Sequence, residues 1–247
     1  MTREDPAPLV EALALSGGEP VVLPLLTTRW LPFEIPDGRT LDDYDWVAFT
    51  SVRALEALAR QVDKRGWSWP PRARAAAVGD RTAHELQAQA WMPECVAENS
   101  TAHGLVECLC AQGVLGARIL FPCSAIAETT LPDGLRAAGA HVDVVAVYTT
   151  ESAWAHAPEQ LPLLGRELRV ALERGCVATC ASPSAARALA DLASAAGALD
   201  SLRRTPIVVI GPTTGEAVEL LGLRAIEAGG RSLAALARKA VEVGRLH

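Results

Sequence analysis

The chain has few of the residues that mark several classes of protein. Aromatic residues make up only 4% of its 247 residues, and lysine occurs only at Lys64 and Lys239. The other basic residues are arginines without a dense run, and 29 acidic against 23 basic residues give a net charge of −6. A protein that binds duplex nucleic acid usually carries a basic face or arm. We therefore expect no nucleic-acid partner.

Long apolar runs are missing as well. A helix that spans a membrane needs about 18 or more apolar residues in a row, and no window of the sequence approaches that length. The first residues, Met1–Pro6, contain no apolar segment of the kind that directs secretion. We therefore expect a cytoplasmic protein without a membrane partner.

The cysteines are too few and too irregularly spaced for the disulfide framework of a small secreted domain. They are Cys95, Cys108, Cys110, Cys123, Cys176 and Cys180. We expect reduced thiols that pack as small apolar side chains. Because no paired histidines lie beside them at ligand spacing, no metal site is predicted.

Apolar residues are abundant, at 50% of the chain, and they follow an α/β rhythm. Short apolar runs alternate with Ala/Leu/Arg stretches at helical spacing, which is typical of parallel sheets covered by helices. The expected strands are 46–50, 75–78, 118–121, 142–148, 176–181 and 206–210. The expected helices are 52–60, 81–90, 185–196, 215–221 and 233–243. The length suits two domains of roughly 100–150 residues each.

An internal repeat organises this rhythm. Segment 46–58 aligns with 177–189, so that Ser51 corresponds to Ser182. Gly79 and Gly211 follow these serines at nearly equal distances, and segment 100–105 aligns with 231–236. The offset stays at 131–132 in all three blocks. The sequence therefore predicts two copies of one α/β unit.

Each copy has two strand-to-helix turns rich in hydroxyl groups and glycine. They are 50–51 and 79–82 in the first copy, and 182–184 and 211–214 in the second. Ser and Thr at such turns can serve simply as helix N-caps. However, all turns of this type lie at the carboxyl ends of parallel strands, where open α/β folds bind ligands. Free amides and the positive helix end favour carboxylates or phosphates there.

Other chemical motifs are weaker. Gly211-Pro212-Thr213-Thr214 lacks the lysine of a phosphate-binding P-loop, and no glycine-rich dinucleotide motif follows the first strand. The histidines are scattered and form no Ser-His-Asp order. Tyr148 ends an apolar strand, and the pattern alone favours a packing residue over an acid.

Several short motifs occur in a distinctive order along almost the whole chain. They are Val47–Ser51, Ala77–Gly79 with Thr82-Ala83, Ile119–Pro122 with Leu131 and Gly139, Val147–Thr150, Ser182–Ser184 and Ile210–Thr214. In this order and spacing the chain resembles the uroporphyrinogen-III synthase family.

The resemblance implies two similar parallel-sheet α/β domains joined by a two-stranded β-ladder, with the active site in the cleft between them. Residues 1–22 and 153–247 would form one discontinuous domain, and 35–143 the inserted domain. Residues 23–34 and 144–152 would form the ladder.

The resemblance also implies an activity and a set of site residues. The family converts hydroxymethylbilane, a linear polycarboxylate, into uroporphyrinogen III with loss of water and inversion of the last pyrrole ring, as a lyase of tetrapyrrole and heme biosynthesis. It uses no metal or organic cofactor. By analogy Tyr148 assists loss of the hydroxyl group, and Thr213 and Thr214 bind a substrate carboxylate. The further substrate contacts implied are Thr50, Ser51, Thr82, Ser182, Ser184 and Gly211. We expect a monomer and leave open a transient contact with the upstream deaminase.

Three departures from the family pattern leave an alternative open. Thr2-Arg3 follows Met1 directly, where the family usually has several apolar residues first, so the first strand is expected to be short or absent. The segment after Phe121-Pro122 lacks an arginine often seen there, and Cys180-Ala181 replaces a Phe-Thr type of pair. The alternative is a non-catalytic, two-lobed module that binds a small anionic metabolite. A two-domain solute-binding protein is disfavoured, because the sequence shows no secretory segment and the expected connection is a ladder.

Overall fold

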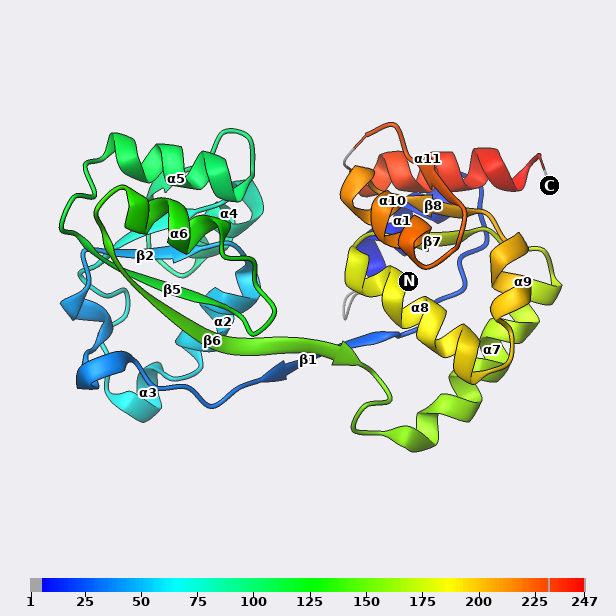
Figure 1. The fold of residues 1–247 in the computed structure, drawn as a ribbon, viewed down its shortest axis with the longest axis horizontal. Coiled ribbons are helices and arrows are strands. Elements are labelled where there is room, and N and C mark those ends of the chain that lie inside the picture. The colour runs from blue at the N-terminus through cyan, green and yellow to red at the C-terminus, as the bar shows by residue number, and fades with distance from the viewer. Residues whose placement is uncertain (1–5, 231, 247) are drawn as a thin grey trace. The chain divides into compact units, whose positions relative to one another are not determined.

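The computed structural model describes residues 6–230 and 232–246, and the chain divides into two compact units (Figure 1). Unit 1 comprises Met1–Thr28 and Thr150–His247, and unit 2 comprises Arg29–Thr149. Both units are α/β, as the sequence predicts. The short or absent first strand expected around Thr2-Arg3 lies outside the described residues.

Unit 2 contains a parallel sheet in the order β6-β5-β2-β3-β4. Its strands are β2 (Trp46–Phe49), β3 (Arg74–Ala77), β4 (Pro93–Val96), β5 (Arg118–Ser124) and β6 (His141–Ser152). All four residues of β2 are buried, and they alternate between two apolar clusters, one on each face of the sheet. The strand is therefore a continuous apolar run, as expected for a central parallel strand.

A sixth strand, β1 (Leu26–Trp30), continues this sheet beside β6. Near one end of the pair, the Leu31 amide donates to the Val147 carbonyl, and near the other the Ala153 amide donates to the Leu25 carbonyl. Because residue numbers rise on one strand while they fall on the other, β1 is antiparallel to β6. The six-stranded sheet is therefore mixed.

Helices cover both faces of the unit 2 sheet. They are α2 (Val52–Ala59), α3 (Val62–Arg65), α4 (Asp80–Ala88), α5 (Ala102–Ala111) and α6 (Thr130–Ala137), with 3₁₀ turns at Pro36–Gly38 and Leu41–Asp43. Leucines of α2 and α4 pack in the cluster on one face, and leucines of α5 and α6 pack in the cluster on the other.

Unit 1 contains the parallel strands β7 (Ala178–Cys180), β8 (Ile207–Val209) and β9 (Ala225–Glu227), in that order. Its helices are α1 (Ala7–Leu15), α7 (Leu161–Glu173), α8 (Pro183–Ala195), α9 (Leu199–Arg204), α10 (Pro212–Leu220) and α11 (Leu233–Gly244), with a 3₁₀ turn at Pro158–Gln160. Helices α7 to α10 pack on one face of β8, and α1 and α11 pack on the other.

The expected elements occur with shifted bounds. Helix α10 begins at Pro212 rather than at 215, because a proline has no amide to satisfy in the first turn and is favoured there. The sequence analysis did not delimit α1, α3, α5, α6, α7, α9, β4 or β9.

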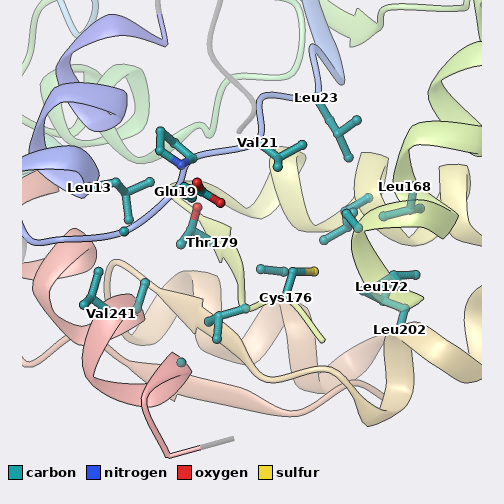
Figure 2. Close-up of a pocket in the computed structure, with 18 of the residues that line it drawn as sticks. Leu13, Glu19, Val21, Leu23, Leu168, Leu172, Cys176, Thr179, Leu202 and Val241 are labelled. Atoms are coloured by element: carbon teal, nitrogen blue, oxygen red, sulfur yellow. The ribbon is translucent and has the colours of Figure 1, made fainter. Parts of the chain in front are cut away.

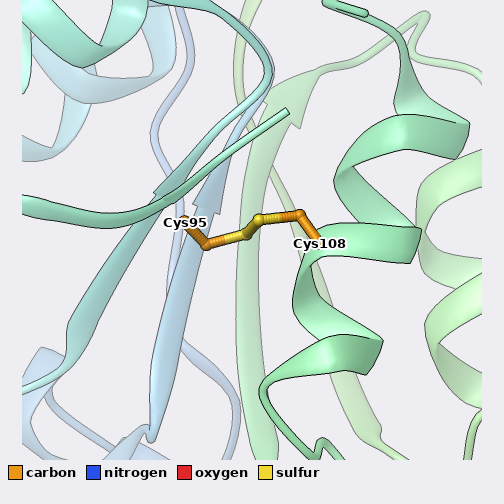
Figure 3. Close-up of a disulfide and its surroundings, with 2 residues drawn as sticks. All are labelled: Cys95 and Cys108. Carbon is orange, nitrogen blue, oxygen red and sulfur yellow. A yellow bond between two sulfur atoms is a disulfide. The ribbon is translucent and has the colours of Figure 1, made fainter. Parts of the chain in front are cut away.

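The expectation that all cysteines are reduced is wrong for two of them. Cys95 at β4 and Cys108 on α5 form a disulfide, with Cα atoms 6.1 Å apart (Figure 3). Helix α5 follows β4 directly and folds back over it, which brings together two cysteines 13 positions apart. Spacing alone does not show this packing. The other four cysteines are free thiols.

Candidate active site

The two predicted turns of unit 2 adjoin each other at the carboxyl edge of its sheet. Strands β2 and β3 pair with Phe49 opposite Ala77, and the Val78 amide donates to the Phe49 carbonyl at 2.9 Å. The chain then enters α2 after Ser51 and α4 after Gly79. The Ser51 hydroxyl caps α2 by accepting a hydrogen bond from the Ala54 amide at 3.2 Å. Gly79 offers no capping side chain, so the first amides of α4 have no such partner.

Tyr148 joins this edge from β6. The tyrosine lies opposite Ser124, at the end of β5, and its side chain is buried. Its phenol oxygen lies 3.0 Å from the Ser51 hydroxyl oxygen, within hydrogen-bond distance. The structure therefore brings together the candidate acid and one candidate substrate contact at the N-terminus of α2. The sequence offered no direct sign of this pair, because it depends on the strand order β6-β5-β2.

Two residues that were not predicted lie next to this edge: Trp30 contacts Tyr148, and Arg60 contacts Trp30. The Trp30 ring packs edge-on against the Tyr148 ring, with centroids 6.4 Å apart. The exposed Arg60, just after α2, places its guanidinium carbon 4.7 Å from the centroid of the Trp30 ring. A cation over an aromatic face is attracted electrostatically. The Arg60 guanidinium is thus held against the indole that packs on Tyr148.

Glycine is required at position 79 because the turn that contains Ser100 passes close to its Cα atom. A Cβ atom at this position would lie 2.7 Å from the Ser100 hydroxyl oxygen. Ser100 itself has a positive φ of 50° in the turn before α5. Because the φ of Gly79 is 177°, which any residue adopts, the constraint here is steric.

Unit 1 repeats the geometry of these turns. Cys180 lies opposite Val209, and the Ile210 amide donates to the Cys180 carbonyl at 3.2 Å. The Ser182 hydroxyl caps α8 by accepting from the Ala185 amide at 3.2 Å. Gly211 precedes α10 without a capping side chain and has the extended backbone of its counterpart in unit 2. The repeat predicted from the sequence therefore extends to the hydrogen bonds.

The predicted hydroxyl residues differ in how they can meet a ligand. Thr82 and Thr214 occupy matching positions in the first turns of α4 and α10, and both side chains are buried, at 5% and 3% exposure. Thr213 is exposed. Ser184 lies on α8 with its hydroxyl 3.0 Å from that of Ser182. Thr50, between β2 and Ser51, is partly exposed.

Tyr44, the other tyrosine of the chain, has a structural role. The Tyr44 hydroxyl donates to the Asp143 carboxylate at 2.6 Å, and Arg39 donates to the same carboxylate at 2.9 Å. Burial, together with the hydrogen bond to Asp143, raises the pKa of Tyr44 well above its usual range. Tyr44 therefore stays protonated and ties the start of unit 2 to β6.

Metal-binding clusters do not occur in residues 6–230 and 232–246, where no three His, Cys, Asp or Glu side chains come together. The buried Cys180 adds no nucleophile, because burial raises the pKa of its thiol to about 12. Within the same described part of the chain, every helix is too short or too polar to cross a membrane.

A family model described as "Uroporphyrinogen-III synthase HemD" matches residues 7–238, nearly the whole chain. The chain belongs to the uroporphyrinogen-III synthase family. The resemblance drawn from the motifs is thus confirmed, and family membership links the chain to tetrapyrrole biosynthesis.

Curated relatives agree with membership of the uroporphyrinogen-III synthase family. A provisionally named uroporphyrinogen-III synthase of Methanothermobacter thermautotrophicus is 28% identical over 229 residues, which cover 90% of this chain and 88% of the relative. A uroporphyrinogen-III synthase of Synechococcus elongatus is 29% identical over 163 residues, 63% of this chain and 59% of the relative.

Two solved structures share the fold. The uroporphyrinogen-III synthetase of Helicobacter pylori matches with a TM-score of 0.63 at 16% identity, over 89% of this chain and 91% of that chain. A mutant uroporphyrinogen III synthase of Thermus thermophilus matches with a TM-score of 0.59 at 17% identity, over 97% and 95% of the two chains. At these identities the likeness shows the fold alone.

Proposed function

We propose that the protein is a uroporphyrinogen-III synthase that cyclises hydroxymethylbilane to uroporphyrinogen III with inversion of ring D and loss of water. The observation that carries the proposal is the pairing of the Tyr148 and Ser51 hydroxyls at the N-terminus of α2, in a chain of this family. The substrate loses its hydroxyl group as water, which requires a proton or a strong hydrogen bond on the departing oxygen.

The hydrogen bonds around Ser51 suit this step. Its hydroxyl oxygen already accepts from the Ala54 amide, and its own proton remains available for the Tyr148 oxygen. In that arrangement the Tyr148 proton is free to bond to the departing hydroxyl. As Tyr148 gives up proton density, negative charge develops on its oxygen, and the positive end of α2 stabilises that charge.

The remaining turns provide binding groups for carboxylates. We propose that Thr213 and Thr214 at the start of α10 bind one substrate carboxylate. Pro212 has no amide, and the Thr214 and Gly215 amides bond to the Gly211 carbonyl at 3.1 and 3.0 Å, so the Thr213 amide and hydroxyl are the groups available for it. The other proposed contacts are Thr50, Ser51, Thr82, Ser182, Ser184 and Gly211. Thr82 and Thr214 are buried, and their amides bond to the Gly79 and Gly211 carbonyls at 3.1 Å each, so their proposed contribution is to shape the helix starts beside the exposed groups.

The finer domain organisation is part of the same proposal. Residues 1–22 with 153–247 would form one domain, 35–143 the other, and 23–34 with 144–152 the ladder, with the substrate held between the domains. The bilane cyclises unaided to isomer I, so the main task of the enzyme is to hold the chain in the geometry that leads to isomer III. The protein would act as a monomer without a cofactor.

A coupled assay tests the activity. Hydroxymethylbilane is generated in situ, the protein is added, and the type I and type III uroporphyrins are separated after oxidation. We expect the product to change from isomer I to isomer III. If folded protein yields only isomer I, the proposed activity is wrong and the non-catalytic binding module takes its place.

The role of Tyr148 has its own test. Because Tyr148→Phe removes the proton donor but little volume, we expect isomer III to form about 10–100-fold more slowly, equivalent to the loss of a hydrogen bond worth about 1.5–3 kcal/mol in the transition state. Tyr44→Phe is the matched control, since it removes a buried phenol of unit 2 that bonds to Asp143. Equal rates for Tyr148→Phe and the parent protein would show that the assigned role is wrong.

A further inference from the structure

The disulfide of unit 2 spans a turn that lies beside the candidate site. Cys95 is on β4, Cys108 is on α5, and turn 97–101 connects these two elements. Strand β4 pairs with β3, and the chain leaves β3 to enter α4 after Gly79. The carboxyl ends of two neighbouring strands therefore lead into turn 97–101 and into the start of α4.

The turn is packed between two helix starts. On one side, a Cβ atom at Gly79 would lie 2.7 Å from the Ser100 hydroxyl oxygen, so the turn lies against the start of α4. On the other side, a Cβ atom at Gly104 would overlap the Asn99 side-chain amide, so the turn also lies against the first turn of α5. The Thr101 hydroxyl caps α5 by accepting from the Gly104 amide at 3.1 Å. A displacement of α5 would therefore displace the turn that contacts Gly79.

Apolar packing and the disulfide hold α5 on the sheet in different ways. Leu105 and Leu109 are fully buried in the apolar cluster that also contains Cys95. Apolar packing is non-directional, so it keeps the helix on the sheet without fixing every small movement along it. The disulfide adds a covalent link that holds the Cα atoms of Cys95 and Cys108 6.1 Å apart. The state of this bond therefore bears on the position of α5 more than on whether α5 packs.

The free cysteines of unit 2 are poorly placed to attack the disulfide. Cys123 is buried in the same apolar cluster, and burial raises the pKa of its thiol to about 11, so little thiolate forms at neutral pH. Cys110 is exposed, but it lies two positions after Cys108 on the same helix. Two such positions point about 200° apart around a helix. Exchange inside unit 2 is therefore disfavoured.

The cysteines of unit 1 are also unreactive. Cys176 lines a mostly apolar cavity of about 360 Å³ together with Leu172 and Leu202 (Figure 2). Burial raises the pKa of the Cys176 thiol, and it raises the pKa of Cys180 to about 12. The disulfide is therefore expected to respond to external thiols and disulfides rather than to exchange within the chain.

We propose that Cys95 and Cys108 form a redox switch that sets how firmly turn 97–101 is held against the start of α4. In the oxidised form the disulfide fixes α5 and the turn, whereas in the reduced form only packing and hydrogen bonds hold them. The consequence for catalysis rests on the proposed function, because the start of α4 belongs to the proposed substrate site.

The redox step is an exchange with a small dithiol or disulfide. In reduction, a dithiol such as dithiothreitol attacks the disulfide, passes through a mixed disulfide and leaves as a cyclic disulfide, while Cys95 and Cys108 gain two electrons and two protons. In oxidation, a small disulfide such as glutathione disulfide accepts two electrons and two protons from the two cysteines and leaves as two thiols. Cys108 is partly exposed and Cys95 is buried, so an external reagent approaches from the α5 side.

The first test compares the full chain in its two redox states. Peptide mass mapping should find the link between Cys95 and Cys108 after treatment with glutathione disulfide and should find it broken after dithiothreitol. We expect amides of turn 97–101 and of the first turn of α5 to exchange hydrogen at least fivefold more slowly in the oxidised protein. The first turn of α10 in unit 1 is the internal control and should exchange equally in both states. Reduction should also lower the unfolding temperature by about 5–10 °C.

Two variants show whether this pair is responsible. Cys108→Ala should keep the exchange rates of the reduced protein even under oxidising conditions. Cys110→Ala, on the same helix, removes an exposed free thiol and should keep the full response. The proposal is overturned if Cys108→Ala still responds to the oxidant, or if the turn exchanges equally fast in both states of the parent protein. If Cys108→Ala does not fold, the two states of the parent protein decide the matter.

The effect on the site is measured separately, after the reagents are removed. Under the proposed function, reduction should raise the KM for hydroxymethylbilane about threefold and leave kcat within about twofold, because the turn supports a helix start and does not contact Tyr148. An unchanged KM in an active enzyme would show that the bond only stabilises unit 2, which would overturn the switch. If neither state forms isomer III, the proposed function is wrong, while the exchange rates still decide whether the disulfide holds the turn.

Discussion

The contact between Ser51 and Tyr148 makes a quantitative prediction. Ser51→Ala removes two interactions at once: the cap of α2, at 3.2 Å from the Ala54 amide, and the bond to the Tyr148 phenol, at 3.0 Å. An N-cap is worth about 1 kcal/mol, and a hydrogen bond between buried neutral groups about 1 kcal/mol. We therefore expect unit 2 to lose about 2 kcal/mol of unfolding free energy.

A double-mutant cycle separates the two contributions. Ser51→Ala and Tyr148→Phe each break the hydroxyl pair, so the double variant should be about 1 kcal/mol more stable than the sum of the single losses predicts. The matched cycle combines Ser51→Ala with Tyr44→Phe, whose phenol bonds to Asp143 in the same unit, and it should be additive. Urea unfolding followed by fluorescence and circular dichroism provides the free energies.

The same variants test whether Ser51 acts through Tyr148. If Ser51 orients the phenol, Ser51→Ala should slow isomer III formation in the parent protein, by less than Tyr148→Phe does, and should have no further effect in the Tyr148→Phe background. Two results would refute the reasoning. One is a coupling energy between Ser51→Ala and Tyr148→Phe below about 0.3 kcal/mol, and the other is a double variant whose loss of rate equals the product of the two single losses.

Three further predictions concern the surroundings of the site. Gly79→Ala should cost about 1–2 kcal/mol, because its Cβ would meet the Ser100 hydroxyl, and Ser100→Gly should restore most of that loss in urea unfolding. If the Arg60 guanidinium binds a substrate carboxylate, Arg60→Ala should raise KM about tenfold and change kcat little in steady-state kinetics. The KM of Arg60→Lys should lie between those of the parent protein and Arg60→Ala. Burial raises the pKa of Cys180 to about 12, so the folded state keeps a proton that the unfolded chain loses above about pH 9, and this one thiol should lower stability by up to about 1.4 kcal/mol per pH unit from there. Cys180→Ala should remove that share of the slope in a pH series of unfolding curves and leave the share from the other buried thiols, such as Cys123.

The sequence predicted the helix N-caps of the site, because an N-cap depends only on the residues next to it. Ser51 and Ser182 follow apolar strands and precede helical spacing, and both are N-caps in the structure. The pairing of Ser51 with Tyr148 was not predictable in this way, because the two residues are 97 positions apart and meet only through the order of three strands. The contacts of Trp30 and Arg60 were not predictable for the same reason, because nothing in the sequence around either residue indicates which distant residue it packs against.

The disulfide shows the same limit. Cys95 and Cys108 meet only because α5 packs back on β4, and no spacing rule requires that packing. The internal repeat, by contrast, supplied non-local information that propensity and periodicity lack, because it predicted the matching turns of the two units.

The two units share the backbone geometry of their turns but differ in the side chains beside them. Ser51 and Ser182 are equivalent caps, but Ser182 has the hydroxyl of Ser184 as its partner at 3.0 Å, in place of a phenol. Segment 17–28 aligns without a gap with segment 139–150, so Leu26 stands in unit 1 where Tyr148 stands in unit 2, and it packs against the apolar core of unit 1. The proposed proton donor is therefore present in one copy only, while helix starts without a capping side chain, after Gly79 and Gly211, are present in both. Under the proposed function, the helix starts of either unit would serve carboxylates, whereas the single departing hydroxyl would need one acid. This division predicts that substitutions in the turns of unit 1 change KM, and that Tyr148→Phe changes kcat.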